Sequence, residues 1–267
     1  MGKGSAMAIT RDLFSLEGKV AIVTGVGGRP NGIGEAYAQA LGAFGARVVA
    51  TDIKADGAEA AAGRLTAAGV KAIGVEVDIT DPASVARMVE RARDAFGGVD
   101  ILVNNAALML EALGNRTSTI GLDDWNRIFA VNLTGALLCS QAVAPIMRER
   151  GGGRIVNQLS SGAFPAQGVY GVSKLALAGL TTALAQELGR SHITVNAIAP
   201  GITDSGAGLT LRANPTRYFE ILQETCALRV RGAPDELCGA LLYLCSEAGS
   251  WTTGQILHVD GGIVIRP

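Results

Sequence analysis

The chain has 267 residues, of which 48% are hydrophobic and 4% aromatic, and a net charge of −1. This length suffices for one α/β domain, and the abundance of small residues suits helices packed closely on a sheet better than a β-sandwich. The balanced charge argues against nucleic acid as a partner. With two histidines and four scattered cysteines, the sequence also argues against a metal site and a disulfide framework.

The two ends of the chain carry little fold information. Residues 1–15 open with small side chains, and we expect them to be a flexible N-terminal segment, followed by one folded domain over residues 16–267. No apolar run approaches the roughly 20 residues that span a bilayer, and the first ten residues lack the apolar stretch of a secretory signal. We therefore expect a cytoplasmic protein without a membrane partner.

Strand-like and helical patterns alternate along the chain. The first strand, KVAIVT, runs into a glycine cluster and then into a helical pattern. Seven strands are predicted, at residues 19–24, 46–52, 70–78, 99–105, 153–159, 193–200 and 254–260. Helices are predicted at residues 32–45, 56–68 and 168–189, after Asp81-Pro82, and in the other long stretch between strands, at residues 106–152.

This alternation predicts the fold class. Continuously apolar strands alternating with helices indicate a parallel sheet that is covered on both faces, because right-handed crossovers place the helices there. We expect a single-domain, doubly wound α/β (Rossmann) fold with a seven-stranded parallel sheet and its ligand at the carboxyl ends of the strands. The longest stretch without periodicity, about residues 203–231, is a candidate substrate lid.

A glycine-rich segment, TGVGGRPNGIG at residues 24–34, lies between the first strand and the first helix. Glycines there let the backbone approach a pyrophosphate, which the helix N-terminus can stabilise. The alternative is an ordinary glycine-rich turn. Because a strand precedes it and a helix follows, we favour a dinucleotide-binding loop, with contacts from Gly25, Gly32, Ile33 and Gly34.

Asp52 stands at the end of the second predicted strand. A carboxylate at this place can accept hydrogen bonds from the adenosine ribose and would repel a 2′-phosphate, so we predict NAD rather than NADP as the cofactor. Two alternatives remain open. Asp52 could cap the following segment, and Arg29 or Lys54 could attract a phosphate.

Tyr170 and Lys174 form a Y-x-x-x-K pattern, which places both side chains on one face of a helix. An ammonium group beside a phenol lowers the pKa of the phenol, so Tyr170 becomes a candidate acid/base near neutral pH. Such a pair alone usually decorates a solvated helix face. Ser160, at the end of the fifth strand, could hold a substrate oxygen beside Tyr170, with Ser161 as the other candidate.

Six motifs occur in one order: the glycine loop with its TG, NNAA at 104–107, VNLTG at 131–135, Ser160, Y-x-x-x-K, and APG at 199–201. In this order the chain resembles the short-chain dehydrogenase/reductase family over residues 16–265. The resemblance implies a catalytic tetrad of Asn132, Ser160, Tyr170 and Lys174, in which Asn132 orders a water that links Lys174 to a proton relay. Without the resemblance, Asn132 would be interpreted as a helix-interior residue bonded to nearby backbone.

The resemblance also implies further cofactor contacts. Asp78 would contact the adenine ring, and Asn104 and Ala106 the adenosine side. The remaining residues that it assigns to the cofactor are Ile79, Tyr170, Lys174, Pro200, Gly201, Ile202, Thr203 and Ser205. Asp78 could instead be a simple strand-end cap.

The chain departs from the family pattern at several positions. Six residues, 26–31, separate Gly25 from Gly32, so the phosphate loop is longer than usual. NNAA replaces N-N-A-G, Leu159 stands where a first serine is frequent, and Ser205 stands where threonine is frequent. None of these changes removes a reacting group.

These observations predict an oxidoreductase that transfers a hydride between NAD(H) and a secondary alcohol or ketone, with Tyr170 as general acid/base. The resemblance allows a secondary alcohol, a cyclic diol or dihydrodiol, or a keto compound such as an oxoacyl thioester as substrate, and implies a homotetramer. The alternatives are a catalytically silent NAD-binding sensor or scaffold and, last, an isomerase or dehydratase. His192 and His258 are expected to be structural.

Overall fold

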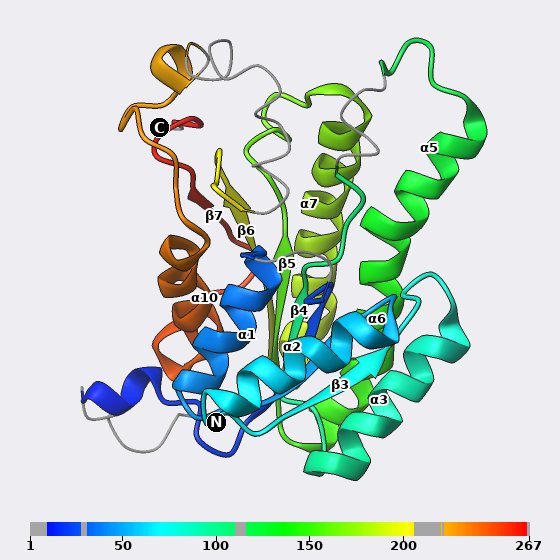
Figure 1. Ribbon diagram of the computed structural model, residues 1–267, viewed down its shortest axis with the longest axis vertical. Coiled ribbons are helices and arrows are strands. Elements are labelled where there is room, and N and C mark those ends of the chain that lie inside the picture. The colour runs from blue at the N-terminus through cyan, green and yellow to red at the C-terminus, as the bar shows by residue number, and fades with distance from the viewer. Residues whose placement is uncertain (1–9, 28–30, 110–115, 206–219, 221, 266–267) are drawn as a thin grey trace.

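A seven-stranded parallel sheet forms the centre of the computed structural model, which describes residues 10–27, 31–109, 116–205, 220 and 222–265 (Figure 1). The strands are β1 (Val20–Thr24), β2 (Arg47–Asp52), β3 (Ala72–Glu76), β4 (Ile101–Asn104), β5 (Gly153–Gln158), β6 (Ile193–Pro200) and β7 (Ile256–Val259). Their order is β3-β2-β1-β4-β5-β6-β7, and every pairing is parallel. The predicted doubly wound, single-domain α/β fold is confirmed.

The strand order reverses at β1, which pairs with β2 on one side and with β4 on the other. The chain builds outward from β1 to β3, then returns across the sheet to β4 and continues outward to β7. Because the connections diverge on either side of β1, a crevice opens beyond the carboxyl ends of β1 and β4. This reversal decides where a ligand can bind.

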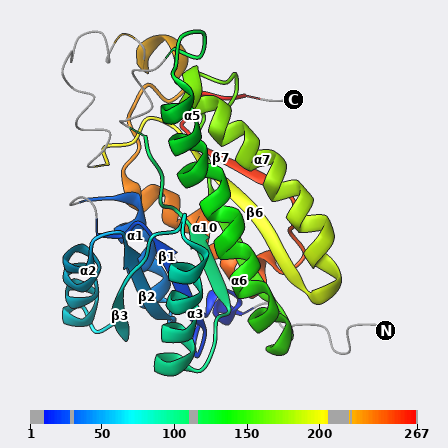
Figure 2. The ribbon, with the colours of Figure 1, turned by 90° about the vertical axis from the view of Figure 1, so that its right-hand side faces the viewer.

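Helices cover both faces of the sheet (Figures 1 and 2). One face carries α1 (Ile33–Ala43), α2 (Ala55–Ala67) and α10 (Cys238–Cys245). The other carries α3 (Pro82–Phe96), α6 (Gly135–Glu149) and α7 (Gly168–Leu188), with α5 (Leu122–Phe129) preceding α6. Figure 2 views this second layer from outside, with the sheet behind it.

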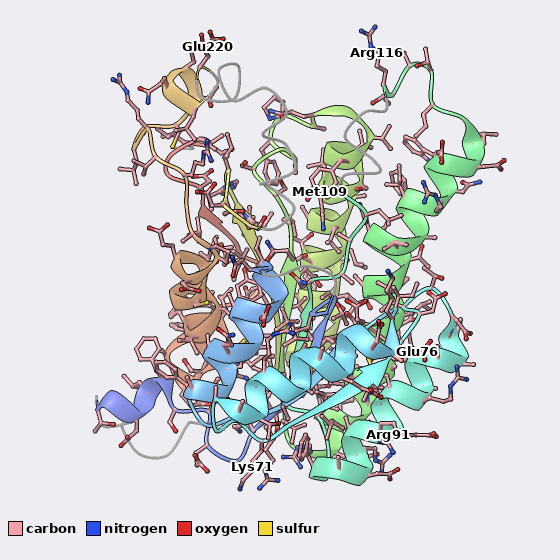
Figure 3. The ribbon with its side chains drawn as sticks, in the orientation of Figure 1. Lys71, Glu76, Arg91, Met109, Arg116 and Glu220 are labelled. Carbon is pink, nitrogen blue, oxygen red and sulfur yellow. The ribbon has the colours of Figure 1, made fainter. Side chains whose placement is uncertain are left out.

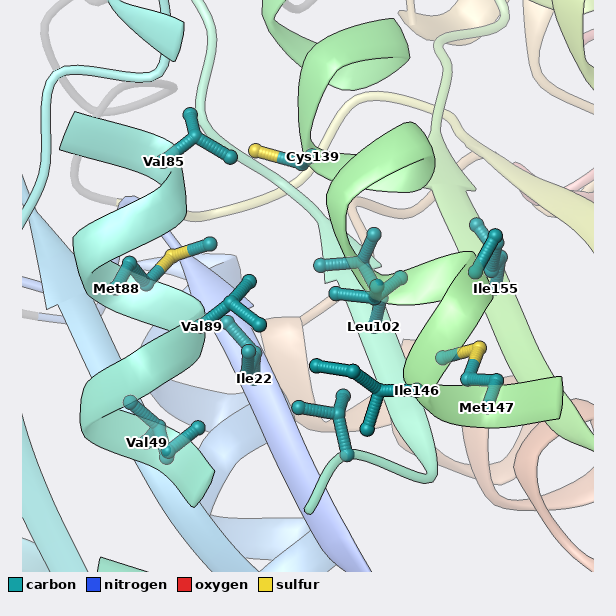
Figure 4. Packing of buried hydrophobic residues seen from close by; sticks show 14 of the residues in the cluster. Ile22, Val49, Val85, Met88, Val89, Leu102, Cys139, Ile146, Met147 and Ile155 are labelled. Carbon is teal, nitrogen blue, oxygen red and sulfur yellow. The ribbon is translucent and has the colours of Figure 1, made fainter. Parts of the chain in front are cut away.

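One of two main apolar clusters lies between the sheet and α3, α6 and α7. Figure 4 shows α3 and α6 contributing side chains above the strands, among them Met88, Val89 and Ile146, over Ile22 and Leu102. A second cluster lies on the opposite face, beneath α1 and α10. Because strand residues pointing to either face are buried, the strands read as continuous apolar runs, which is why periodicity predicted a parallel sheet.

Local sequence signals set the helix ends. At α3, the Asp81 carboxylate accepts hydrogen bonds from the backbone N–H groups of Ala83 and Ser84, Pro82 occupies the first turn, and Gly97 ends the helix in the left-handed region at φ 85°. The predicted strands are correct but most are shorter at one or both ends. The long helical stretch before β5 is interrupted, since a π-helical turn at Ala130–Thr134 separates α5 from α6.

Two helical stretches are long and apolar, although the sequence suggested no membrane-spanning run. Leu122–Glu149 and Gly168–Ser191 are long and apolar enough to cross a bilayer by length and mean hydropathy, with values of 1.5 and 1.2 in their most apolar windows. Both belong to the layer that packs on the sheet, and 44% and 56% of those windows are buried. Burial against the sheet accounts for much of their apolar character.

Two predicted segments fall partly outside the described residues. Of the expected flexible segment 1–15, residues 10–15 are described and contain a 3₁₀ turn at Arg11–Phe14, whose N-cap Thr10 accepts from the Asp12 N–H through its hydroxyl oxygen. Of the candidate lid 203–231, residues 206–219 and 221 lie outside the described part. The two ends of this segment are bonded to each other, since Asp204 N donates to Gly232 O at 2.8 Å and the Arg231 guanidinium donates to the Asp204 carboxylate at 2.9 Å.

Candidate active site

A cavity of about 780 Å³ lies at the carboxyl ends of the strands. Its walls come from the segments that follow β1, β2, β3, β4, β5 and β6, and from the start of α7. Met109, labelled in Figure 3, belongs to this wall and lies well above Lys71 and Arg91, which mark the amino-terminal end of the sheet. The cavity occupies the crevice that the strand order predicts.

The glycine loop holds the ends of β1 and β4 close together. The Thr24 hydroxyl oxygen accepts hydrogen bonds from the backbone N–H groups of Asn105 and Ala106, both at 3.0 Å. Gly25 has φ +70°, and a Cβ there would lie 2.8 Å from Ala106 Cα. Gly34 packs equally tightly, since its Cβ would lie 2.7 Å from the Gly25 carbonyl oxygen. Only glycine fits at these two positions.

The N-terminus of α1 faces the cavity without a side-chain cap. Gly32 is the N-cap residue and provides no side-chain oxygen, and Gly32, Ile33 and Gly34 all line the cavity. The first-turn N–H groups of a helix carry partial positive charge and need acceptors. Uncapped donors beside a glycine-built loop fit the diphosphate of a dinucleotide.

Asp52, the last residue of β2, also belongs to the cavity wall. One carboxylate oxygen accepts from the Gly27 N–H at 3.0 Å, and the other accepts from the Lys54 N–H at 3.2 Å. The side chain therefore does cap the following segment, as one alternative held, and it also lines the cavity. A carboxylate accepts hydrogen bonds on two oxygens with several lone pairs, so it retains capacity to accept from a ligand hydroxyl.

Ser160, Tyr170 and Lys174 converge in the same cavity. The Ser160 side chain is hydrogen-bonded to the Tyr170 hydroxyl. Lys174 is 1% exposed, its Nζ lies 5.8 Å from the centre of the Tyr170 ring, and the ammonium donates to the Gln158 carbonyl oxygen at 2.7 Å. The structure brings these three predicted residues together in one cavity.

The expected lowering of the Tyr170 pKa is wrong for the protein as it stands. Burial raises the pKa of Tyr170 to about 12, while the hydrogen bond with Ser160 acts in the opposite direction. Burial also lowers the pKa of Lys174 to about 7. Both charged forms are penalised by leaving water, and this desolvation is the main cause of both shifts. Near neutral pH, Tyr170 therefore carries its proton.

Asn132 lies in the π-helical turn, is 1% exposed, and does not line the cavity. Its amide oxygen accepts from Leu108 N at 2.8 Å, and its amide nitrogen donates to Leu108 O and to Ser173 Oγ. These bonds fix the backbone of the cavity wall at Leu108 and connect it to α7. The side chain positions these elements, and the role that the resemblance implies for Asn132, ordering a water that links Lys174 to a proton relay, stays a prediction.

The prediction that Asn104 contacts the cofactor is wrong. Its side chain points into the protein, where the amide nitrogen donates to Ala136 O, Ser140 Oγ and Asn157 Oδ1. Asn105 lines the cavity instead, and its amide nitrogen donates to the carbonyl oxygens of Thr24 and Gly25. Successive residues at a strand end point to opposite sides, so a shift of one residue exchanges the two roles.

The other predicted cofactor residues are brought together at the cavity. These are Gly25, Gly32, Ile33, Gly34, Asp52, Asp78, Ile79, Ala106, Tyr170, Lys174, Pro200, Gly201, Ile202, Thr203 and Ser205. Asp78 is at once a local cap, since one carboxylate oxygen accepts from the backbone N–H and the hydroxyl of Thr80. His192 and His258 lie outside this wall.

Several residues of the wall were missed by the sequence analysis. They include Val26, Gly27, Leu108, Met109, Gln158, Gly162 and Gln167. Leu108 and Met109 follow the NNAA motif and have no composition signal of their own. Gln158 is different, because an amide side chain at the end of a predicted buried strand is a sequence anomaly that could have marked it.

The family comparison agrees with this geometry. A family model described as enoyl-(acyl carrier protein) reductase matches residues 28–264. Together with the relatives below, this shows that the chain belongs to the short-chain dehydrogenase/reductase family. Members of this family are oxidoreductases that bind a nicotinamide cofactor and act on small-molecule substrates.

Individual relatives cover nearly the whole chain. An uncharacterised oxidoreductase of Mycobacterium tuberculosis is 46% identical over 94% of this chain and 99% of its own length. The 3-oxoacyl-[acyl-carrier-protein] reductase of Aquifex aeolicus is 36% identical over 94% and 99%. A 7α-hydroxysteroid dehydrogenase, solved with NADH and 7-oxo glycochenodeoxycholic acid, superposes with a TM-score of 0.87 at 34% identity over 95% of this chain and 97% of that one.

The buried lysine gives a pH-dependent prediction for stability. The ordinary lysine pKa is 10.5 and that of Lys174 about 7, so between these values the unfolded chain binds more protons than the folded protein. The stability contribution of Lys174 therefore rises with pH across this window, and its burial penalty is fully present below it. We predict that Lys174→Met raises the free energy of unfolding near pH 6 by ~1 kcal/mol or more.

Urea unfolding at several pH values tests this prediction. The advantage of Lys174→Met should shrink as the pH approaches 10, because the wild-type lysine is then largely neutral when folded and the variant has lost the bond to Gln158 O. A difference between variant and wild type that stays constant from pH 6 to pH 10 would contradict the lowered pKa.

Proposed function

We propose that this protein transfers a hydride between NAD(H) and a secondary alcohol or ketone, with Tyr170 as general acid/base. The observation that carries the proposal is the placement of Ser160, Tyr170 and Lys174 in one cavity with the uncapped N-terminus of α1. A dinucleotide held at α1 would extend toward Tyr170, beside which a substrate oxygen can bind.

The chain's own residues account for the proton. The nicotinamide, when bound, supplies or accepts the hydride. For ketone reduction, Ser160 and Tyr170 both hydrogen-bond the carbonyl oxygen, and Tyr170 donates its proton to that oxygen as the carbon gains the hydride. Oxidation of the alcohol reverses both transfers. Near neutral pH, Tyr170 carries the proton that reduction of a ketone consumes.

The substrate class follows from what the relatives share. The names of the Aquifex aeolicus reductase and of the 7α-hydroxysteroid dehydrogenase both specify a hydroxyl or oxo group on a secondary carbon. In this chain the cavity wall combines apolar Leu108, Met109 and Ile202 with polar Gln167. We therefore propose a secondary alcohol or ketone whose reacting carbon is attached to an apolar body.

Replacement of the acid/base tests the mechanism. We predict that Tyr170→Phe lowers kcat roughly 10²–10⁴-fold, because the variant keeps the ring but has no proton to transfer. Dissociation constants for NADH should stay close to the wild-type value. The measurement is nicotinamide absorbance with a panel of secondary alcohols, cyclic diols, ketones and oxoacyl thioesters.

The outcomes of this experiment are distinct. Turnover by Tyr170→Phe at the wild-type rate would refute the acid/base assignment. Cofactor binding by the wild type without turnover of any panel member would favour the silent sensor or scaffold.

The preference for NAD is proposed from Asp52. Its carboxylate is fixed at the end of β2 by the N–H groups of Gly27 and Lys54, and lies where a doubly wound fold places the adenosine ribose. A fixed negative charge there accepts from ribose hydroxyls and repels a 2′-phosphate. Lys54 lines the same wall, but it contacts Asp52 through its backbone N–H.

Removal of this charge should change cofactor preference. We predict that Asp52→Asn lowers the ratio of kcat/KM for NAD over NADP by about tenfold or more, since a repulsion worth ~1.4 kcal/mol corresponds to that factor. Asp56→Asn is the matched control, because Asp56 also lines the cavity but lies in the first turn of α2. An unchanged ratio in Asp52→Asn, or an equal change in both variants, would refute the assignment.

A homotetramer is proposed from the family resemblance and from exposed apolar side chains on the outer helices. Leu122 on α5 and Leu175 on α7 are 76% and 45% exposed on the layer that Figure 2 views from outside. Apolar side chains of this kind favour contact with another copy. Light scattering should give four times the mass of the chain, and a monomeric mass would refute the proposal.

A further inference from the structure

A buried polar pair joins α1 to β5 beneath the cavity. The Tyr37 hydroxyl donates to Gln158 Oε1 at 2.8 Å, and the two side chains are 0% and 6% exposed. Around Tyr37 lies the apolar cluster that packs α1 and α10 on the sheet. A tyrosine hydroxyl and a carboxamide carry a desolvation cost in such surroundings, which an apolar pair would not carry. Packing alone therefore does not account for this buried polar pair.

The hydrogen bond from Tyr37 orients the amide of Gln158. Burial raises the pKa of Tyr37 well above its ordinary value, so its hydroxyl keeps the proton that it donates. With the amide oxygen held by Tyr37, the amide nitrogen occupies the other side of the group. Within the described part of the chain, no hydrogen bond is formed by the two N–H groups of that nitrogen.

Gln158 also belongs to the cavity wall, between its two functional ends. Gln158 is one of the residues that line the cavity, and its carbonyl oxygen accepts from Lys174 Nζ at 2.7 Å. The side chain extends toward α1, whose first residues Ile33 and Gly34 line the same cavity. A dinucleotide that runs from the start of α1 to Tyr170 must therefore pass Gln158.

We propose that Gln158 is a cofactor-binding residue, whose amide N–H groups donate to an acceptor oxygen in the nicotinamide half of the dinucleotide. Tyr37 is its positioning residue, since it holds the amide in the orientation that presents these donors. The inference rests on the proposed nicotinamide site and adds to it a donor that neither the glycine loop nor the tetrad supplies.

Cofactor binding without turnover provides the test. NADH, or NADPH if the wild type prefers it, is titrated into the wild type, Gln158→Met and Tyr37→Phe, and the fluorescence of the reduced nicotinamide gives each dissociation constant. Both substitutions keep the approximate shape of the side chain. Loss of one hydrogen bond predicts roughly 3- to 10-fold weaker binding for Gln158→Met, and a smaller weakening for Tyr37→Phe.

The double variant separates positioning from an independent effect. If Tyr37 acts through Gln158, Tyr37→Phe weakens binding in the wild type but adds nothing in the Gln158→Met background. Multiplicative effects of the two changes would refute the positioning role of Tyr37. KM for the cofactor should rise in Gln158→Met while kcat with saturating cofactor changes little.

Tyr243→Phe is the matched control. Tyr243, on α10, also forms a tyrosine hydroxyl contact with a side chain, Thr252 Oγ1 at 2.6 Å, and lies outside the cavity wall. It should lower thermal stability without changing the dissociation constant. If Gln158→Met binds cofactor as tightly as wild type, the inference is refuted while wild-type turnover still supports the proposed function. If the wild type binds neither cofactor, the proposed function fails and the inference fails with it.

Discussion

The side chain of Thr24 holds together the two strand ends between which the active site opens. Its oxygen accepts from two successive N–H groups after β4, and its hydroxyl reaches the carbonyl oxygen of Val103. The chain leaves β1 and β4 in opposite directions at this point, and the buried Thr24 hydroxyl holds the ends of these two strands together. The close packing of Gly25 on Ala106, and through it the position of the uncapped start of α1, depends on this tie.

The reacting groups lie where their charged forms are disfavoured by desolvation. Lys174 is buried and Tyr170 partly buried on one helix face, and this removal from water penalises either charge, so the pKa of each moves toward its neutral form. A cavity of this kind responds strongly to any charge that enters it, because the effective dielectric constant is low. The stability of the rest of the fold offsets the cost of burying these two groups.

The sequence was sufficient for the fold because the relevant signals are local and repeated. Apolar strands such as β1, buried along its full length, show no alternation, and their spacing left room only for helical crossovers. The cavity could be placed as well, since every parallel strand directs its carboxyl end to it. Asn104 and Asn105 show where this reasoning stops, because the direction of a side chain at a strand end depends on the last residue that stays in register. The pKa of Tyr170 was misjudged for a related reason, since burial is a property of the packed protein and not of the Y-x-x-x-K spacing.

The hydrogen bonds that join the two ends of the candidate lid, near Ile202 and Gly232, affect how this protein could change its substrate. Gly232 N donates to Ile202 O and Gly232 O accepts from Asp204 N, so the chain enters and leaves the candidate lid at nearly one point. When the ends of a loop are fixed together, lengthening it adds little to the entropy of closing it. Extra residues between these two points would therefore cost the fold little, whereas the returning part of the segment is attached to the sheet end, since Leu222 and Cys226 are buried and Leu228 N donates to Gly261 O. A change of substrate through this segment would have to keep those contacts.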